Sequence, residues 1–421
     1  MRPIYVLLAI VMLAAPVVYG VSLKASAAWP DDTLSLVAQI EPGNPRYSDL
    51  VGLTVGTRDI IVLGGSFESN PLHIVEVTDP NNPVDLGEWS GSQGWSHALD
   101  VARGPGNVVL VGDEHFGAYA VDLTDPESPV ELGHVGSLDR LHNSASDGNV
   151  LYWVSNETNL VERVDFSDPA NPVVLPSLVA AAPNVHGVDY KNGRLYASAP
   201  SGNWPNTGIV TVFDVSVEPP VKLVEIVTGQ STHSVAVDDS GDYMVVSKET
   251  DNGEADIWDI SDLGDPAVVS HVGGFGEGAS SSHDYVWVGN ILYSTWASAG
   301  FHVFDVSVPG VPTHVGGFDT TLAAGGATYA TGAWDSWPFF GDDRIVVSDM
   351  QNGLFILSLA DIPPTPTPTP SPTATATATA TPTATPVPTP VTNDKCVWLD
   401  WFTAVYGSDA TTAEQESVYG C

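Results

Sequence analysis

The sequence has few basic residues. Its 421 residues include 13 Lys and Arg against 51 Asp and Glu, so the formal net charge is −38. A field this negative repels phosphate backbones and anionic lipid headgroups, so we expect no nucleic-acid partner. The same field is compatible with high solubility, with cation attraction or with a salty medium, and composition does not separate these.

Cysteine is nearly absent. The two cysteines, Cys396 and Cys421, both follow a Pro/Thr-rich stretch, so the large middle of the chain must be stable by packing alone. In an oxidising compartment we expect the two to form one disulfide. In the chain-entropy model it would stabilise the short segment by about 3 kcal/mol.

Long apolar runs are confined to the N-terminus. Arg2 precedes an apolar stretch from Ile4 to Val18, and Ala25-Ser26-Ala27 supplies a small-x-small cleavage site before Ala28. This pattern predicts a signal peptide over residues 1–27 and a secreted or cell-surface protein. An uncleaved membrane anchor is the alternative, because Ile4 to Leu23 is about long enough to span a bilayer.

Turn-forming residues are abundant and charged residues make up only 15% of the chain. The 33 prolines and 40 glycines favour a long all-β architecture. A strand followed by an Asp-Pro-x-x-Pro turn recurs along the chain. The clearest copies are Leu72 to Val84, Ala120 to Val130 and Val161 to Val173, and weaker copies begin at Val210, Ala255, Phe301 and Leu354. Their turns are 43 to 53 residues apart, which is the size of a propeller blade.

Two further strands precede each copy, so each unit has four short antiparallel strands. Such units bury their faces by radial stacking, and we predict a seven-bladed β-propeller over residues 28–362. A solenoid is the competing repeat fold. The last copy, Gly353 to Leu359, has no outer strand, whereas Thr33 to Ile40 is an orphan strand. We therefore expect this N-terminal strand to complete the last blade and close the ring.

The repeat unit, of the type Val-Asp-Val-Ser-Asp-Pro-x-x-Pro-Val, resembles that of the LVIVD-repeat propeller family of secreted proteins. The segments His283 to Val286, Gly300 to Ser307, Gly332 to Phe340 and Asp349 to Leu357 are similar to the end of the "choice-of-anchor B" proteins. The resemblance implies the propeller fold and says little about function. The units at Val217 and Val308 lack the turn aspartate, so this Asp is a doubtful generic ligand.

A second periodicity concerns histidine. His97, His142, His186, His233 and His283 each open the first strand of a unit, and Asp49 aligns without gaps against His233 in the first unit. The last unit places Trp334 nearby. Since first strands line the axial channel of a propeller, we expect these six residues to form a ring at one mouth. Neutral imidazole binds zinc, copper and iron, so the ring is a candidate site for a divalent transition metal.

Two other interpretations of this histidine ring remain open. The histidines could be structural and bond a neighbouring blade, or they could act directly as acids and bases. His134, His271 and His314 each precede Val-Gly in an outer strand, and we interpret them as structural.

Residues 363–391 alternate Pro-Thr and Ala-Thr and predict an extended spacer. Residues 392–421 form a short module, in which apolar residues at helical spacing predict an amphipathic helix closed by the disulfide. No catalytic or nucleotide-binding motif occurs. The sequence favours a monomeric binding scaffold for an extracellular protein, glycan or surface. A metal-dependent enzyme, working on the histidine ring, is the alternative.

Overall fold

The computed structural model describes residues 34–43, 46–65, 71–93, 98–113, 116–136, 141–155, 157–200, 208–229, 232–248, 254–273, 275, 282–297, 299–321 and 332–359. The predicted signal peptide, spacer and C-terminal module, with both cysteines, lie outside these ranges. The described residues form strands and no helix. No helix long and apolar enough to cross a membrane is found among them.

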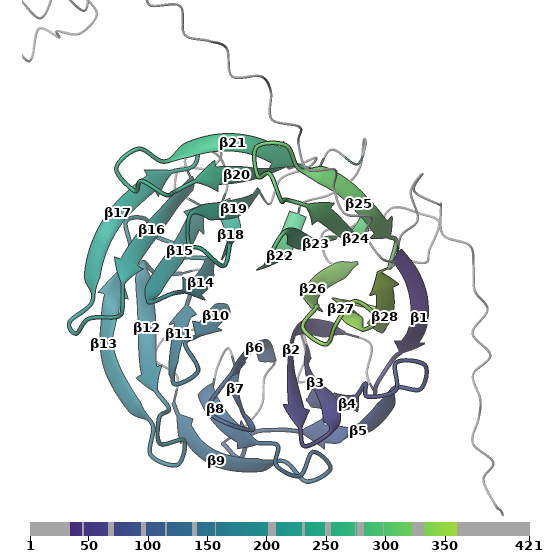
Figure 1. Ribbon diagram of the computed structural model, residues 1–421. Helices are drawn as coiled ribbons and strands as arrows, with labels where there is room; N and C mark the ends of the chain where they lie inside the picture. The colour runs from purple at the N-terminus through teal and green to yellow at the C-terminus, as the bar shows by residue number, and fades with distance from the viewer. Residues whose placement is uncertain are drawn as a thin grey trace, which may run out of the picture. The chain divides into compact units, whose positions relative to one another are not determined.

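Seven four-stranded antiparallel sheets stand around one axis, with one inner strand of each at the centre (Figure 1). The predicted seven-bladed propeller is thereby confirmed. Blade 1 consists of β2 (Tyr47–Val55), β3 (Arg58–Gly65), β4 (Leu72–Glu76) and β5 (Val84–Trp89); blade 2 of β6 (Ala98–Arg103), β7 (Val108–Asp113), β8 (Gly117–Asp122) and β9 (Val130–Val135); blade 3 of β10 (Asn143–Ser146), β11 (Val150–Val154), β12 (Leu160–Asp165) and β13 (Val173–Val179); blade 4 of β14 (Gly187–Lys191), β15 (Arg194–Pro200), β16 (Gly208–Asp214) and β17 (Val221–Val227). Blade 5 consists of β18 (Thr232–Val237), β19 (Tyr243–Lys248), β20 (Ala255–Asp259) and β21 (Ala267–Val272); blade 6 of β22 (Ser282–Val288), β23 (Ile291–Trp296), β24 (Gly300–Asp305) and β25 (Thr313–Phe318); blade 7 of β26 (Ala333–Trp337), β27 (Ile345–Asp349), β28 (Gly353–Leu359) and β1 (Leu34–Ile40).

The ring is closed by the two ends of the described chain. Strand β1 pairs antiparallel with β28, from Leu34 opposite Leu359 to Ile40 opposite Leu354. In Figure 1 the purple β1 lies directly outside β28 in the last blade. This confirms the predicted pairing, and it satisfies the backbone groups of β28 that would otherwise form an open sheet edge.

The hydrophobic core lies between blades. Seven clusters of buried side chains occur, and each joins one pair of neighbouring blades. In one of them, Trp153 and Phe166 of blade 3 pack with Leu110 of blade 2. Because both faces of each sheet are covered by a neighbour, the middle strands are largely apolar, as in β11.

The repeated aspartates are structural. The carboxylate of Asp79 accepts a hydrogen bond from the backbone N–H of Asn81 at 3.0 Å, and the carbonyl of Asp79 accepts one from Asn82. The same backbone bond closes the turn at Val308, where Val311 N–H donates to the Val308 carbonyl at 2.7 Å. The turn therefore forms without the aspartate, which accounts for its loss from the weaker copies.

Candidate functional site

The inner strands carry two consecutive polar positions toward the axis. In blades 1, 5, 6 and 7 the pairing of the inner strand with its neighbour shifts by one residue just before Leu50, Val235, Tyr285 and Ser336. A bulge of this kind re-aims side chains that would otherwise alternate between the two faces of a strand. Two successive residues can then face the channel, and they form two layers along the axis.

The first layer is an arc of four imidazoles, which we call the histidine arc: His142, His186, His233 and His283. They come from blades 3, 4, 5 and 6, and neighbouring rings lie 4.1, 4.3 and 4.6 Å apart between centroids. The indole of Trp334 in blade 7 continues the arc, 3.7 Å from the ring of His283. His97, predicted to belong with them, lies outside the described residues.

Two members of the arc, His142 and His186, are neutral at pH 7. Burial, followed by the nearby His233 and His283, lowers the pKa of His142 to about 4. Burial and His233 also lower the pKa of His186. The Nε2 atoms of His142 and His186 are 3.0 Å apart, so in the absence of another ligand one ring carries the proton and the other accepts it.

Asp49 does not lie in this arc, and its predicted alignment with His233 was wrong by one residue. The strand pairing makes Leu50 equivalent to Val235, so Asp49 is equivalent to Ser234, and Ser48 to His233. The inner strand is buried on both faces, and its apolar run therefore fits either register when only the sequence is compared.

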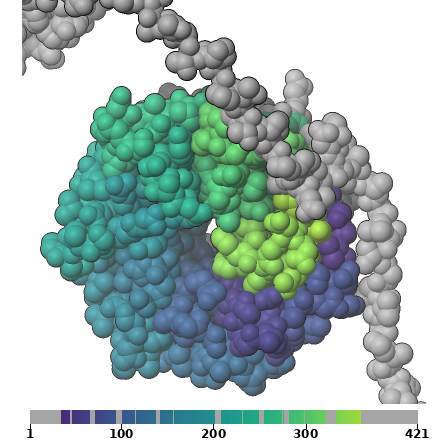
Figure 2. All heavy atoms as spheres, viewed as in Figure 1, coloured from purple at the N-terminus to yellow at the C-terminus, as the bar shows by residue number. Residues whose placement is uncertain are grey.

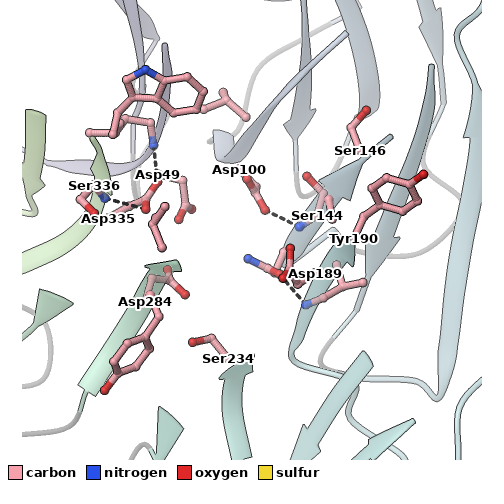
Figure 3. Close-up of a pocket in the computed structure, with 18 of the residues that line it drawn as sticks. Asp49, Asp100, Ser144, Ser146, Asp189, Tyr190, Ser234, Asp284, Asp335 and Ser336 are labelled. Atoms are coloured by element: carbon pink, nitrogen blue, oxygen red, sulfur yellow. Dashed lines mark hydrogen bonds between the residues drawn. The ribbon is translucent and has the colours of Figure 1, made fainter. Parts of the chain in front are cut away.

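The second layer, which we call the carboxylate layer, consists of Asp49, Asp100, Asp284 and Asp335. They belong to blades 1, 2, 6 and 7, the part of the ring that the histidine arc leaves largely free, and blade 6 contributes to both layers. Figure 3 shows these four side chains gathered around the same opening. Sequence reasoning missed three of them. A gapped comparison that placed Asp49 beside Asp284 and Asp335 would have revealed the column.

The four carboxylates oppose one another electrostatically. Burial raises the pKa of Asp49, and the charges of Asp100 and Asp335 raise it further. Burial likewise raises the pKa of Asp100. Burial and then Asp284 raise the pKa of Asp335 to about 7. Burial also acts on Asp284, but the charge and hydrogen bond of His283 outweigh it, so that this pKa lies below its ordinary value.

Three members of the carboxylate layer have structural partners. Asp335 accepts a hydrogen bond from the backbone N–H of Leu50 in the next blade at 3.1 Å, and Asp100 accepts one from Ser144 of the next blade. Asp284 pairs with His283, whose Nδ1 is 3.0 Å away. These bonds tie neighbouring blades or layers together, so these three residues would be needed even without a ligand.

Asp49 differs from the other three. It is only 7% exposed, and neither a bond to the next blade nor an ion pair engages its carboxylate. The indole N–H of Trp334 lies near enough to favour its charged form but makes no hydrogen bond of normal geometry. A buried carboxylate costs free energy unless it is protonated or paired with a cation. Asp49 therefore faces the axis as a group that is stable when it is protonated or when a cation lies beside it.

The carboxylate layer forms one wall of a cavity of about 270 Å³ on the axis. Figure 2 shows the opening at the centre of the ring. The cavity is also lined by hydroxyls of Ser144, Ser146, Ser234 and Ser336, by the apolar Val188, Val235 and Val286, by the aromatic Tyr190, Trp337 and Phe339, and by Asp189. The described residues that line the cavity include no Lys or Arg.

Asp189 adds a fifth carboxylate to the cavity. Burial raises the pKa of Asp189 to about 6. Its carboxylate accepts a hydrogen bond from the backbone N–H of Val237 in blade 5 at 2.9 Å, and this bond lowers the pKa and so limits the rise. The cavity can therefore take up protons near neutral pH or exchange them for a cation.

Among the described residues, no three acidic, imidazole or thiol groups converge closely enough to hold one metal ion. The predicted transition-metal site on the histidine ring therefore stays a prediction, and its His97 member lies outside the described ranges. The outer-strand histidines have local partners, as expected. His134 Nε2 lies 2.6 Å from the Phe116 carbonyl, and His271 Nδ1 lies 2.6 Å from the carboxylate of Asp256.

The fold and this cavity define the class: a seven-bladed β-propeller with an acidic axial cavity beside an arc of four imidazoles. No protein-family model matches the chain, and no curated protein matches it in sequence. Among solved structures, hydrazine synthase of Kuenenia stuttgartiensis is similar over 60% of this chain and 76% of its own, with 15% identity and a TM-score of 0.46. A likeness this distant transfers no property to the chain, and membership of the LVIVD-repeat family stays a prediction.

Proposed function

We propose that this chain is an extracellular binding protein whose axial cavity receives a positively charged group. The observation that carries the proposal is the carboxylate of Asp49, which is buried, lines the cavity and has the indole of Trp334, not a cation, as its neighbour. The described residues that line the cavity include no Lys or Arg, and Asp284 is the one member of the carboxylate layer that is paired with an imidazole, which supports the proposal. The leader-like sequence of residues 1–27 supports an exported location.

The propeller suits this role mechanically. Each blade contributes an inner strand to the cavity wall. Side-chain to backbone hydrogen bonds join neighbouring blades; for example, the backbone N–H of Val188 in blade 4 donates to Oδ1 of Asn143 in blade 3 at 2.9 Å. A cavity built from seven interlocked strands is preorganised, which lowers the entropic cost of binding. Its negative field also raises the local concentration of cations and their rate of entry.

Binding of a cation can be tested by thermal unfolding at pH 7.5 with a panel of metal chlorides and amines. At least one cation should raise the melting temperature of the wild type and leave the double variant Asp49→Asn, Asp335→Asn unchanged. Asparagine keeps the shape and the acceptor for Leu50. The matched control is Asp265→Asn, Asp343→Asn, which removes two exposed carboxylates. If no cation stabilises the wild type more than the double variant, the proposal is wrong.

A second candidate function is metal-dependent chemistry on the histidine arc, as the sequence also suggested. The specific observation is the 3.0 Å separation of the His142 and His186 Nε2 atoms. Two imidazole ligands of one tetrahedral zinc ion, with bonds near 2.0–2.1 Å, are about 3.3 Å apart. Their lowered pKa values also favour the neutral form that binds metals.

This candidate is tested by elemental analysis of protein purified without a histidine tag. It predicts about one zinc, copper or iron per chain, lost in the variant His142→Ala, His186→Ala but kept in His134→Ala. A wild type that stays metal-free after incubation with each ion contradicts it. In that case the arc is structural, and each single substitution within it should lower stability.

A further inference from the structure

The distribution of side chains along the cavity indicates which cation it accepts. We infer that the ligand is an organic cation, a primary ammonium or guanidinium group on a short apolar chain, and not a metal ion. This inference rests on the proposed function, since it specifies the ligand of the same cavity.

The carboxylates are arranged for hydrogen-bond donors and not for a bare ion. A hard metal such as Ca²⁺ takes six to eight oxygens at about 2.3–2.6 Å, mostly from the protein. The described residues offer no three convergent acidic groups that could hold one ion. An ammonium or guanidinium group spreads its donors over a wider volume, and its hydrogen bonds are near 2.7–2.9 Å. Such a group can reach separate carboxylates around the ring.

Hydroxyl groups that can accept those donors line the same cavity from several blades. Ser234 and Ser336 line the cavity beside the carboxylate layer. Ser144 also lines it, and its side chain lies beside the carboxylate of Asp100 and favours the charged form of that group. A bound cation would favour the ionised form of Asp49, and these hydroxyls supply lone pairs without adding charge.

The cavity becomes aromatic away from the carboxylate layer. Trp337 follows Asp335 by two residues on β26, about 7 Å along a strand, and Phe339 lies beyond it. Their rings meet edge to face at 4.7 Å between centroids, and both line the cavity. Phe339 is 53% exposed, which leaves a large apolar surface in water. An aromatic ring beside a cation path also attracts cations through its electron-rich face.

The carboxylate layer at one end of the cavity and the aromatic rings at the other together select an amphipathic cation. The charged head would meet Asp49 and its neighbours, while the chain would lie against Val235, Val286 and Phe339. A volume of about 270 Å³ has room for roughly nine waters, so the ligand is small, on the scale of a lysine or arginine side chain. A free amine and a side chain offered by a partner protein share this chemistry.

The inference is tested by calorimetric titration of the full chain at pH 7.5. The probes are butylamine, phenethylamine and agmatine; 2-phenylethanol is the uncharged match of phenethylamine, and calcium and magnesium chloride are the metal probes. Amines should bind, whereas 2-phenylethanol and the metals should bind at least tenfold more weakly. Asp49→Asn should lower the affinity for every amine at least tenfold, and Asp265→Asn should leave these affinities unchanged.

Phe339→Ala tests the aromatic end separately, because its partly exposed ring can be removed with little effect on the fold. The substitution should weaken the binding of phenethylamine several-fold. It should leave unchanged the affinity for methylamine, an added probe that has no apolar chain to contact the ring. N-acetyl-lysine methylamide and N-acetyl-arginine methylamide, compared with the free amines, show whether a side chain is accepted as readily as a free ligand.

The results separate the two proposals. If calcium binds, loses its affinity in Asp49→Asn and amines do not bind, the cavity is a cation site but the inferred ligand class is wrong. If amines bind equally to wild type and Asp49→Asn, the assigned site is wrong. If no cation binds, both the ligand class and the proposed function are wrong.

Discussion

The imidazole Nδ1 of His283 lies 3.0 Å from a carboxylate oxygen of Asp284, the next residue in the chain. Successive side chains of a strand normally point to opposite faces, but the bulge between Ser282 and Tyr285 turns both toward the channel. This one pair therefore joins the histidine arc to the carboxylate layer, and it is the only such pair among the described residues of the two layers.

The pair should be energetically coupled. In a double-mutant cycle of His283→Asn and Asp284→Asn, we expect a coupling free energy of about 1–3 kcal/mol, because either single change leaves the other polar group buried without its partner. Urea unfolding at pH 7 measures it. Strictly additive effects would show that the contact contributes nothing.

Asp335→Asn should change the pH dependence of stability. The folded pKa of Asp335, about 7, lies above its ordinary 3.8, so between these values the folded chain holds a proton that the unfolded chain has lost. Stability from this group therefore falls as pH rises through that window. Relative to wild type, the variant should gain about 2 kcal/mol between pH 5 and pH 8 in urea unfolding. Asp265→Asn should show no such gain, and a pH-independent difference would contradict the assignment.

His302→Gln should have the opposite pH signature. Burial, with His314 as the second cause, lowers the pKa of His302 to about 3, so from pH 6.5 downward the unfolded chain takes up a proton that the folded chain refuses. Stability from this group is complete above pH 6.5 and falls as pH falls. Between pH 7 and pH 5 the wild type should lose about 2 kcal/mol more than the variant. The exposed Asp265, changed to Asn, is the control, and equal losses in all three proteins would contradict the prediction.

Gly353→Ala should weaken the closure of the ring. Gly353 has φ near +81°, and a Cβ there would meet the Ile40 carbonyl oxygen at 2.2 Å, at the junction of β28 with β1. Left-handed strain and this clash should together cost about 2–4 kcal/mol. Gly310→Ala is the matched control, since nothing lies within 4 Å of its Cβ position. Thermal unfolding of the two variants compares them, and equal melting temperatures would show that the closure tolerates the change.

Much of the architecture could be predicted because it is encoded locally. The Asp-Pro turns and the alternation beside them repeat often enough to count blades, and the unpaired Thr33 to Ile40 segment indicated how the ring closes. The candidate site was harder. The histidine column was visible because His142, His186, His233 and His283 begin their strands at regular spacing. The carboxylate column was missed, since Asp49 was matched to the wrong neighbour.

The sequence by itself determined the number of blades and the turns between strands, because these depend on contacts between residues near in the chain. It also determined which strand closes the ring, because the last repeat lacks one strand and the N-terminal segment is the one strand left over. Only the tertiary structure decided that Asp49, Asp100, Asp284 and Asp335 share one layer and that Asp49 makes no bond to the backbone of the next blade. Strands buried on both faces carry no alternation to set their register, and single-residue bulges shift it. Which side chains meet on the axis therefore depends on how seven separate strands pair with their neighbours.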